Sequence, residues 1–140
     1  MTLVVDAAPL VALADRRDHR QARVEEVLQT EPGELIIPAP TTAEVDYLLG
    51  QRVGRAARLA FLDDLAAGRF TVVSLDARGH GTVADLERQY NDLDAGLADL
   101  SAVVLAERYR TRRLLTFDER HFRTLRPLDG GHFTLLPTDE

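Results

Sequence analysis

The chain has 140 residues, 45% hydrophobic and 29% charged, and 23 acidic against 17 basic residues give a formal net charge of −6. It contains no cysteine, which excludes a disulfide framework, a thiolate metal site and a cysteine nucleophile. All 17 basic residues are arginine, which excludes Schiff-base chemistry, a P-loop and a receiver site that needs lysine. The acidic balance argues against general affinity for nucleic acid but leaves room for a local basic patch.

The length predicts a single domain over residues 1–140, large enough to build its own core. The first six residues carry no basic lead-in of the kind that a secretory signal has. The longest uncharged stretches, such as 7–14 and 35–43, fall far short of the ~20 apolar residues that a membrane span needs. We therefore expect a soluble, cytoplasmic protein.

Short apolar runs alternate with helical patterns along the whole chain. The first half predicts a strand at 3–5, helices at 8–14 and 19–29, a strand at 35–37, and helices at 41–49 and 54–67. The second half predicts a strand at 70–73, helices at 82–90 and 97–110, a strand at 114–117, a short turn of helix, and a strand at 133–136. Helices between strands imply parallel crossovers, and continuous apolar strands suit a sheet covered on both faces. The predicted fold is α/β, a three-layer sandwich with a central, mostly parallel five-stranded sheet.

Four acidic residues stand out by their relation to these strands. Asp6 and Asp118 directly follow the first and fourth strands, Glu44 lies in the helix after the second strand, and Asp99 lies in the helix that leads to the fourth. Ligands of open parallel sheets bind beyond the carboxyl ends of the strands, where the strand order reverses. We expect Asp6 and Asp118 to lie at that edge, with the two helical acids pointing toward them.

The helical acids share apolar faces. The positions three and four residues after Asp99 are Ala102 and Val103, and Glu44 is followed at the same spacing by Tyr47 and Leu48. A carboxylate on such a face is costly unless it is paired, protonated or bound to a metal, and the chain has no lysine to pair it. Clustered carboxylates with water are the ligands that Mg²⁺ or Mn²⁺ prefers, so the pattern favours a divalent metal site.

Simpler interpretations exist for several of these residues. Asp6 and Asp118 each precede a helix and are also explained as N-caps. The run from Thr41 to Glu44 matches a capping box, whereas Asp99 has no such role in its segment. His121 is a candidate for a position near the site, but a packed or surface histidine is the favoured interpretation.

Four motifs occur in an order that resembles a known family. They are Val4-Val5-Asp6, the run Ala39-Pro40-Thr41-Thr42-Ala43-Glu44, the run Leu97-Ala98-Asp99-Leu100-Ser101-Ala102, and the run Leu115-Thr116-Phe117-Asp118-Glu119-Arg120-His121-Phe122. With the terminal run from Phe133 to Pro137, they resemble a PIN domain, specifically a VapC-like toxin of a VapBC toxin–antitoxin pair. The likeness covers the whole chain, and Leu100 stands where the family often has alanine.

The resemblance implies a Mg²⁺- or Mn²⁺-dependent endoribonuclease. Its acidic site carries over to Asp6, Glu44, Asp99 and Asp118, with Asp6 and Asp99 predicted to contact the metal and Glu44 to bind metal or orient water. Asp94 is an outer candidate, and the Thr116 hydroxyl is expected to hold an acid or a water. The resemblance also implies RNA as the substrate, an antitoxin that wraps the toxin, and a homodimer.

Arginine gathers in two stretches, 108–126 and 52–58. Guanidinium groups bind phosphate through paired donors, so we predict that Arg112 and Arg113 contact RNA and that charge reversal there weakens RNA binding and flattens its salt dependence. The same arginines are alternatively a solvated face or a contact for an acidic antitoxin tail. The apolar residues of the helices at 45–49 and 54–67 are candidates for a partner surface, with core packing as the alternative. They include Leu48, Leu49, Leu59, Phe61 and Leu62.

Three other functions compete with that of a toxin nuclease. A PIN-type nuclease that processes RNA outside a toxin–antitoxin pair is the main alternative, and a small upstream partner gene would separate the two. A haloacid-dehalogenase phosphatase is disfavoured because Asp6-Ala7-Ala8 lacks the second acid of its Asp-x-Asp motif and the chain has no lysine. A non-catalytic module is disfavoured because all four acids are present.

Overall fold

The computed structural model describes residues 2–140, and helices alternate with strands along them. The first half of the chain forms β1 (Thr2–Val5), α1 (Ala7–Ala14), α2 (Gln21–Thr30), β2 (Glu34–Pro38), α3 (Ala39–Arg52) and α4 (Arg55–Ala66). The second half forms β3 (Thr71–Val73), α5 (Ala77–Gln89), α6 (Leu97–Arg108), β4 (Arg113–Leu115), α7 (Glu119–Thr124) and β5 (Thr134–Leu136). None of the helices in this part of the chain has the length and apolar character that crossing a membrane requires.

The five strands form one sheet in the order β3-β2-β1-β4-β5, and every neighbouring pair is parallel. The predicted α/β class and five-stranded sheet are confirmed, and the sheet is wholly rather than mostly parallel. The chain moves outward from β1 to β2 and β3, and then returns to the other side of β1 with β4 and β5. The strand order therefore reverses between β1 and β4, where a doubly wound sheet binds its ligands.

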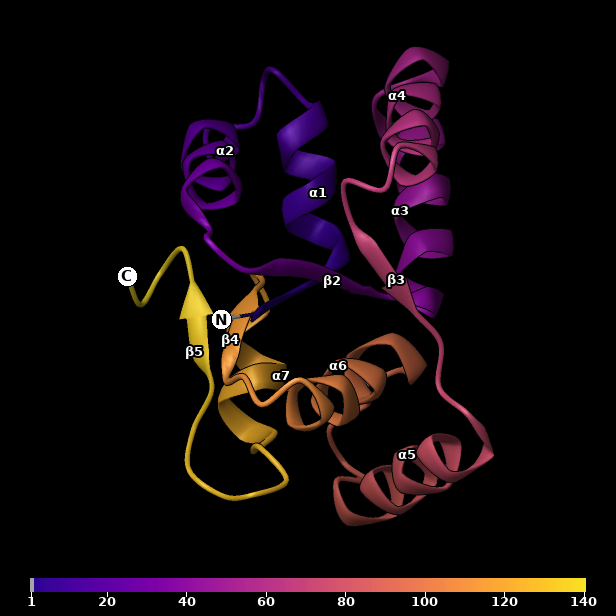
Figure 1. The fold of residues 1–140 in the computed structure, drawn as a ribbon, viewed down its shortest axis with the longest axis vertical. Coiled ribbons are helices and arrows are strands. Elements are labelled where there is room, and N and C mark those ends of the chain that lie inside the picture. Colours follow the sequence, from indigo (N-terminus) through magenta and orange to yellow (C-terminus); the bar gives the residue numbers. More distant parts are fainter. Residues whose placement is uncertain (1) are drawn as a thin grey trace.

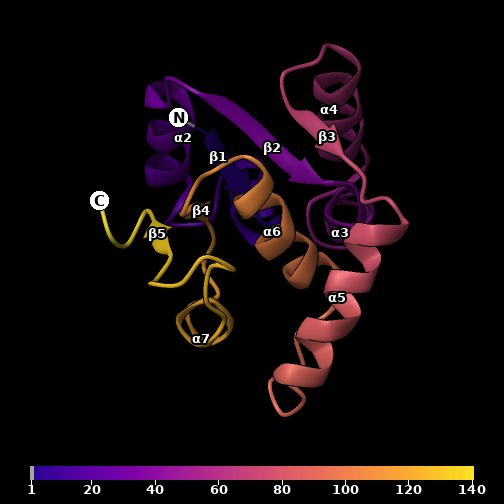
Figure 2. The ribbon, with the colours of Figure 1, turned by 60° about the horizontal axis from the view of Figure 1, so that its bottom comes forward.

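Successive strand residues face opposite sides and enter two separate cores. On β1, Leu3 and Val5 pack with residues of α1, α2, α3 and α4, whereas Val4 packs with residues of α5, α6 and α7. The continuous apolar strands of the sequence are explained by this burial on both faces. Figure 1 shows the resulting layers, with α1 to α4 on one side of the sheet and α5 to α7 on the other. Figure 2 shows α6 lying close to the strands and α5 further out.

The structure corrects two helix starts that the sequence predicts too late. Helix α5 begins at Ala77 rather than at residue 82, because the side chain of Asp76 accepts a hydrogen bond from the Gly79 N–H at 2.8 Å and starts the helix. Gly79 and Gly81 conceal the helical pattern of that first turn in the sequence. Helix α3 begins at Ala39 rather than at residue 41, directly where β2 ends.

Strand β3 departs from the prediction of a sheet covered on both faces. It is a short edge strand in which Thr71 and Val72 are exposed. A short edge strand needs less cover than a central one, so the valines of β3 are less buried than most apolar residues of β1 and β2.

Candidate active site

Asp6 and Asp118 follow the two strands between which the sheet order reverses, and each caps the next helix. The Oδ1 atom of Asp6 accepts a hydrogen bond from the Ala7 N–H at 2.9 Å, at the start of α1. The Oδ1 atom of Asp118 accepts one from the His121 N–H, also at 2.9 Å, at the start of α7. Each cap uses one carboxylate oxygen and leaves Oδ2 free for other contacts. The N-cap interpretation and the site interpretation are therefore compatible.

Thr116 links the two capping aspartates. It is buried at the end of β4, where its hydroxyl donates to Asp6 Oδ2 at 2.7 Å and accepts the Asp118 N–H at 3.0 Å. The Asp6 N–H itself donates to the Leu115 carbonyl at 2.9 Å, which continues the pairing of β1 with β4. Backbone and side-chain contacts thus fix Asp6 relative to the residues that follow β4.

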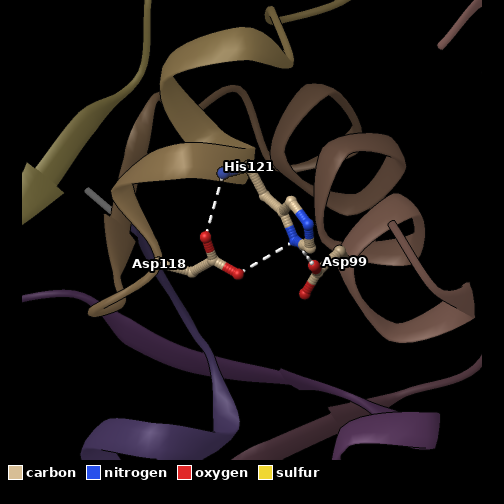
Figure 3. Close-up of side chains that lie close together, drawn as sticks. All are labelled: Asp99, Asp118 and His121. Carbon is tan, nitrogen blue, oxygen red and sulfur yellow. Dashed lines mark hydrogen bonds and ion pairs between the residues drawn. The ribbon is translucent and has the colours of Figure 1, made fainter. Parts of the chain in front are cut away.

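Asp99 approaches Asp118 from helix α6. It lies in the first turn of α6, where the helix dipole favours a negative charge, and, as expected, it does not cap the helix, because the N-cap is Gly96 and no side chain makes a cap hydrogen bond. Its Oδ2 atom lies 2.7 Å from Nδ1 of His121, and Nδ1 lies 2.9 Å from Asp118 Oδ2 (Figure 3). Asp99, Asp118 and His121 form one group whose possible ligand atoms all lie within 4.8 Å of one another.

Glu44 lies on α3 with its side chain exposed, and the capping box considered for it does not form. Helix α3 starts after Pro38 without a side-chain cap, and the Thr42 hydroxyl donates to the Ala39 carbonyl instead. Glu44 makes no hydrogen bond or ion pair with the other acids among residues 2–140, although the charges of Asp6 and Asp99, after burial, raise its pKa.

The acids of the site repel one another and are poorly hydrated. Burial raises the pKa of Asp6, the hydrogen bonds from Thr116 and Ala7 oppose this, and the charge of Asp118 raises it further. Burial likewise raises the pKa of Asp99, and the charge of Asp6 acts in the same direction. The pKa of Glu44 is raised by desolvation and by the charges of Asp6 and Asp99. Among residues 2–140, no arginine forms an ion pair with any of the four acids.

A divalent cation fits this group of residues. Carboxylate oxygens of Asp99 and Asp118 lie close together beside His121, and burial raises the pKa values of Asp99 and of the neighbouring Asp6. A cation held there would favour their ionised forms and remove the mutual repulsion. Asp99, Asp118 and His121 offer ligand atoms that lie close to one another, and the charge of Asp118 acts on the neighbouring Asp6.

His121 is the residue that the sequence interpretation places wrongly. The favoured interpretation is a packed or surface histidine, whereas the structure places the ring between Asp99 and Asp118. The spacing could have found it, because a residue three positions after an N-cap aspartate has its own N–H bound to that carboxylate and lies close to it. No pattern in the sequence indicates that the ring then turns toward Asp99, which is 22 residues away.

Three further candidates lie outside this group. Asp94 is exposed in the loop before α6, in the left-handed backbone region with a φ of 58°. Arg112 and Arg113 lie at the amino end of β4, whereas Asp118 follows its carboxyl end. Arg113 is engaged with Glu31 and Glu140, and Arg112 pairs with Asp129 at 3.2 Å.

The parallel sheet with acids at its reversal point defines a doubly wound α/β protein with a candidate metal site, and comparison with known proteins identifies the family. The PIN domain model matches residues 3–126, so the chain belongs to the PIN-domain family. A curated relative, Ribonuclease VapC26 from Mycobacterium tuberculosis, is 39% identical over 135 residues. That match covers 96% of this chain and 100% of the relative.

Solved structures share the fold at lower sequence identity. The crystal structure of Mycobacterium tuberculosis VapC20, described as a Sarcin-Ricin loop cleaving toxin, matches with a TM-score of 0.76 and 16% identity, covering 83% of this chain and 89% of that one. VapBC2 from Rickettsia felis, bound to a promoter DNA fragment, matches with a TM-score of 0.66 and 16% identity, covering 89% and 93%. A toxin–antitoxin complex from Klebsiella pneumoniae matches with a TM-score of 0.65 and 18% identity, covering 88% and 92%.

Proposed function

We propose that this chain is a divalent-metal-dependent endoribonuclease that acts as the toxin of a toxin–antitoxin pair, with Mg²⁺ or Mn²⁺ as its cofactor. The observation that carries the proposal is the convergence of Asp6, Asp99 and Asp118 at the reversal point of the sheet without an arginine counterion among residues 2–140. The 39% identity to a ribonuclease over nearly the whole chain supports RNA as the substrate.

The side chains of the site are suited to phosphodiester hydrolysis. When bound, a divalent cation supplies positive charge that stabilises the phosphate in the transition state and favours ionisation of water. Asp6 and Asp99 are proposed as its direct contacts, with Asp118 beside them and Thr116 holding Asp6 in place. Glu44, exposed on α3, is proposed to orient the attacking water or accept its proton, or to contact the metal itself.

The antitoxin is proposed to cover the layer formed by α1, α3 and α4. Of the five apolar candidates from the sequence, Leu49 and Phe61 belong to the core and Leu48 packs against it, whereas Leu59 and Leu62 on α4 remain exposed. An apolar groove of about 240 Å³ opens between α1 and α4, lined by residues such as Leu10, Ala57 and Phe70, and Leu59 and Leu62 lie outside it. The solved relatives from Rickettsia felis and Klebsiella pneumoniae are toxin–antitoxin assemblies, which supports a partner of this kind. A homodimer is also proposed, and sedimentation analysis of the purified chain tests it.

Cleavage of total RNA by the purified chain tests the proposed activity. We expect cleavage with Mg²⁺ or Mn²⁺ and none with EDTA, and mapping of the fragment ends would identify the cleaved sequence. An equimolar amount of the product of a small neighbouring gene should suppress the cleavage. Cleavage that no such protein suppresses would instead favour RNA processing outside a toxin–antitoxin pair, and metal-independent cleavage would contradict the proposed chemistry.

A further inference from the structure

The position of His121 suggests more than packing. Its side chain is about as shielded from solvent as that of Asp99, and its Nδ1 atom faces carboxylate oxygens of two aspartates at 2.7 and 2.9 Å (Figure 3). Asp118 follows β4 at the start of α7 and Asp99 lies on α6, so the ring lies between the end of the strand and the neighbouring helix.

The three atoms are spaced like neighbouring ligands of a six-coordinate ion. Bonds of about 2.1 Å at right angles place adjacent ligand atoms roughly 3.0 Å apart. The separations of Nδ1 from Asp99 Oδ2 and Asp118 Oδ2 are close to that value, and the ligand atoms of all three residues lie within 4.8 Å of one another. We infer that Nδ1 of His121 is a nitrogen ligand of the divalent cation, beside Asp99 and Asp118. This inference rests on the proposed function, which requires the cation.

Local structure prepares His121 for this role. Its own N–H donates to Asp118 Oδ1, so the start of α7 holds the aspartate and the histidine as one unit three residues apart. Because Oδ1 is used by the cap, Asp118 presents Oδ2 to the space that it shares with the ring. A pair of ligands fixed by a helix cap needs little rearrangement to bind an ion.

The alternative is that His121 only donates a hydrogen bond to the aspartates and never touches the ion. A single Nδ1–H would then be shared between two carboxylates, and the ring would act as a positioning residue. The two roles predict different surroundings for the metal. A ligand places nitrogen in direct contact with it, whereas a positioning residue leaves it surrounded by oxygen.

A nitrogen ligand also changes which ion the site prefers. Mg²⁺ takes oxygen ligands and retains water, whereas imidazole nitrogen suits first-row transition ions better. We therefore expect this chain to bind Mn²⁺ more tightly than Mg²⁺, and His121 to account for most of the difference.

Electron spin-echo spectroscopy of bound Mn²⁺ tests the inference directly. The samples are the full chain, His121→Gln, His121→Asp and the control His132→Gln, which alters an exposed histidine remote from the site. We expect ¹⁴N modulation on Mn²⁺ in the native chain and in His132→Gln, and none in either His121 variant. The Mn²⁺ dissociation constant of His121→Gln should rise about 10–100-fold. His121→Asp, which offers oxygen instead, should retain Mg²⁺ binding and lose the preference for Mn²⁺.

Absence of ¹⁴N modulation in the native chain would overturn the inference, as would a Mn²⁺ dissociation constant in folded His121→Gln within threefold of the native value. Circular dichroism verifies that each variant is folded. RNA cleavage by the native chain with Mn²⁺ separates the two proposals. Cleavage without nitrogen modulation would overturn only the role of His121, whereas absence of both cleavage and Mn²⁺ binding would overturn the proposed function as well.

Discussion

Buried or partly buried acidic residues lie at both ends of the strands, at the amino edge and at the carboxyl edge of the sheet. Within the part of the chain that the structure describes, they pair with an arginine at the amino edge only. At the amino edge, the side chain of Glu31 is fully buried and pairs with Arg113, which also contacts Glu140 at 3.2 Å. At the carboxyl edge, Asp6 and Asp99 have raised pKa values and no arginine partner among residues 2–140. Both edges belong to β1 and β4 and lie only a strand length apart.

The difference shows how a structural acid can be told from a functional one. A buried carboxylate is costly in either case, and at the amino edge an arginine of the same chain offsets that cost. At the carboxyl edge, His121 opposes this cost only in part, and none of the arginines among residues 2–140 pairs with these acids. An acidic cluster that the protein does not fully neutralise is therefore a candidate for an external cation.

The largest expected effect comes from the carboxyl edge. Asp99→Asn removes a charged ligand while keeping an acceptor for His121, and we expect RNA cleavage to fall about 10³-fold, since a metal contributes several kcal/mol to such reactions. Asp129→Asn, which alters an exposed acid of the amino edge, is the matched control and should cleave at the native rate. Equal activity of the two variants would contradict the claim that the acids of the carboxyl edge are functional and those of the amino edge are not. Cleavage rates on a defined RNA measure both.

Removing the ion pair between Glu31 and Arg113 at the amino edge should lower the free energy of unfolding and leave RNA cleavage unchanged. Glu31→Ala leaves Arg113 with Glu140 alone, and we expect a loss of about 2–3 kcal/mol, somewhat less than for a buried pair that has no second acid. Asp85→Ala, which breaks the exposed pair with Arg88, should cost less than about 0.5 kcal/mol. Urea unfolding compares the two, and similar losses would show that the amino-edge pair is not a structural element.

The folded protein without metal should become more stable when the charge of Asp6 at the carboxyl edge is removed. Because the folded protein raises the pKa of Asp6, it holds the proton more tightly than the unfolded chain does. The stabilisation by protonated Asp6 is complete below its ordinary pKa of 3.8 and is lost as the pH rises through the raised folded value. Asparagine imitates the neutral form at every pH. In EDTA at pH 7, we expect Asp6→Asn to melt about 2–4 °C above the native chain, the shift that ~1 kcal/mol produces.

This stability difference should shrink as the pH falls toward 4, and added Mn²⁺ should raise the melting temperature of the native chain more than that of Asp6→Asn. Differential scanning calorimetry measures both trends. A variant that is less stable than the native chain at pH 7 without metal would contradict the assigned cause of the pKa shift, since the hydrogen bonds to Asp6 would then outweigh its burial.

The smallest effect concerns RNA at the amino edge. Arg112 is half exposed there, so it can meet only an RNA long enough to extend from the acidic site around the sheet. We expect Arg112→Glu to weaken binding of long RNA a few-fold and to lower the salt slope by about one, while a short oligonucleotide at the acidic site binds as before. An unchanged slope with long RNA would exclude Arg112 from the binding surface.

The sequence predicts the layers of this fold well because the central strands are buried on both faces. Runs such as Leu3 to Val5 have no other plausible place than a covered sheet, and the helices between them impose parallel pairing. The prediction from hydrophobic periodicity is wrong where a local hydrogen bond, such as a helix cap, decides where a helix begins. The start of α5 depends on the cap by Asp76, and the two glycines after it suggest a break that does not occur.

The sequence predicts which site residues follow the ends of strands, but it does not predict the direction in which their side chains point. Asp6 and Asp118 are placed by the strands they follow, and parallel pairing alone predicts that they meet. The contact of His121 with Asp99 depends on how α7 packs against α6, which no pattern within either helix encodes. The arginines of β4 show the converse, because their charge suggests RNA while their position at the strand start gives Arg113 acidic partners within the fold.

Calorimetric titration of Mn²⁺ into the purified chain tests most directly whether the acids of the carboxyl edge hold a cation. We predict saturable binding to the native chain that Asp99→Asn abolishes and Asp129→Asn leaves intact. Absence of binding to the native chain, or equal binding to all three proteins, would contradict the account.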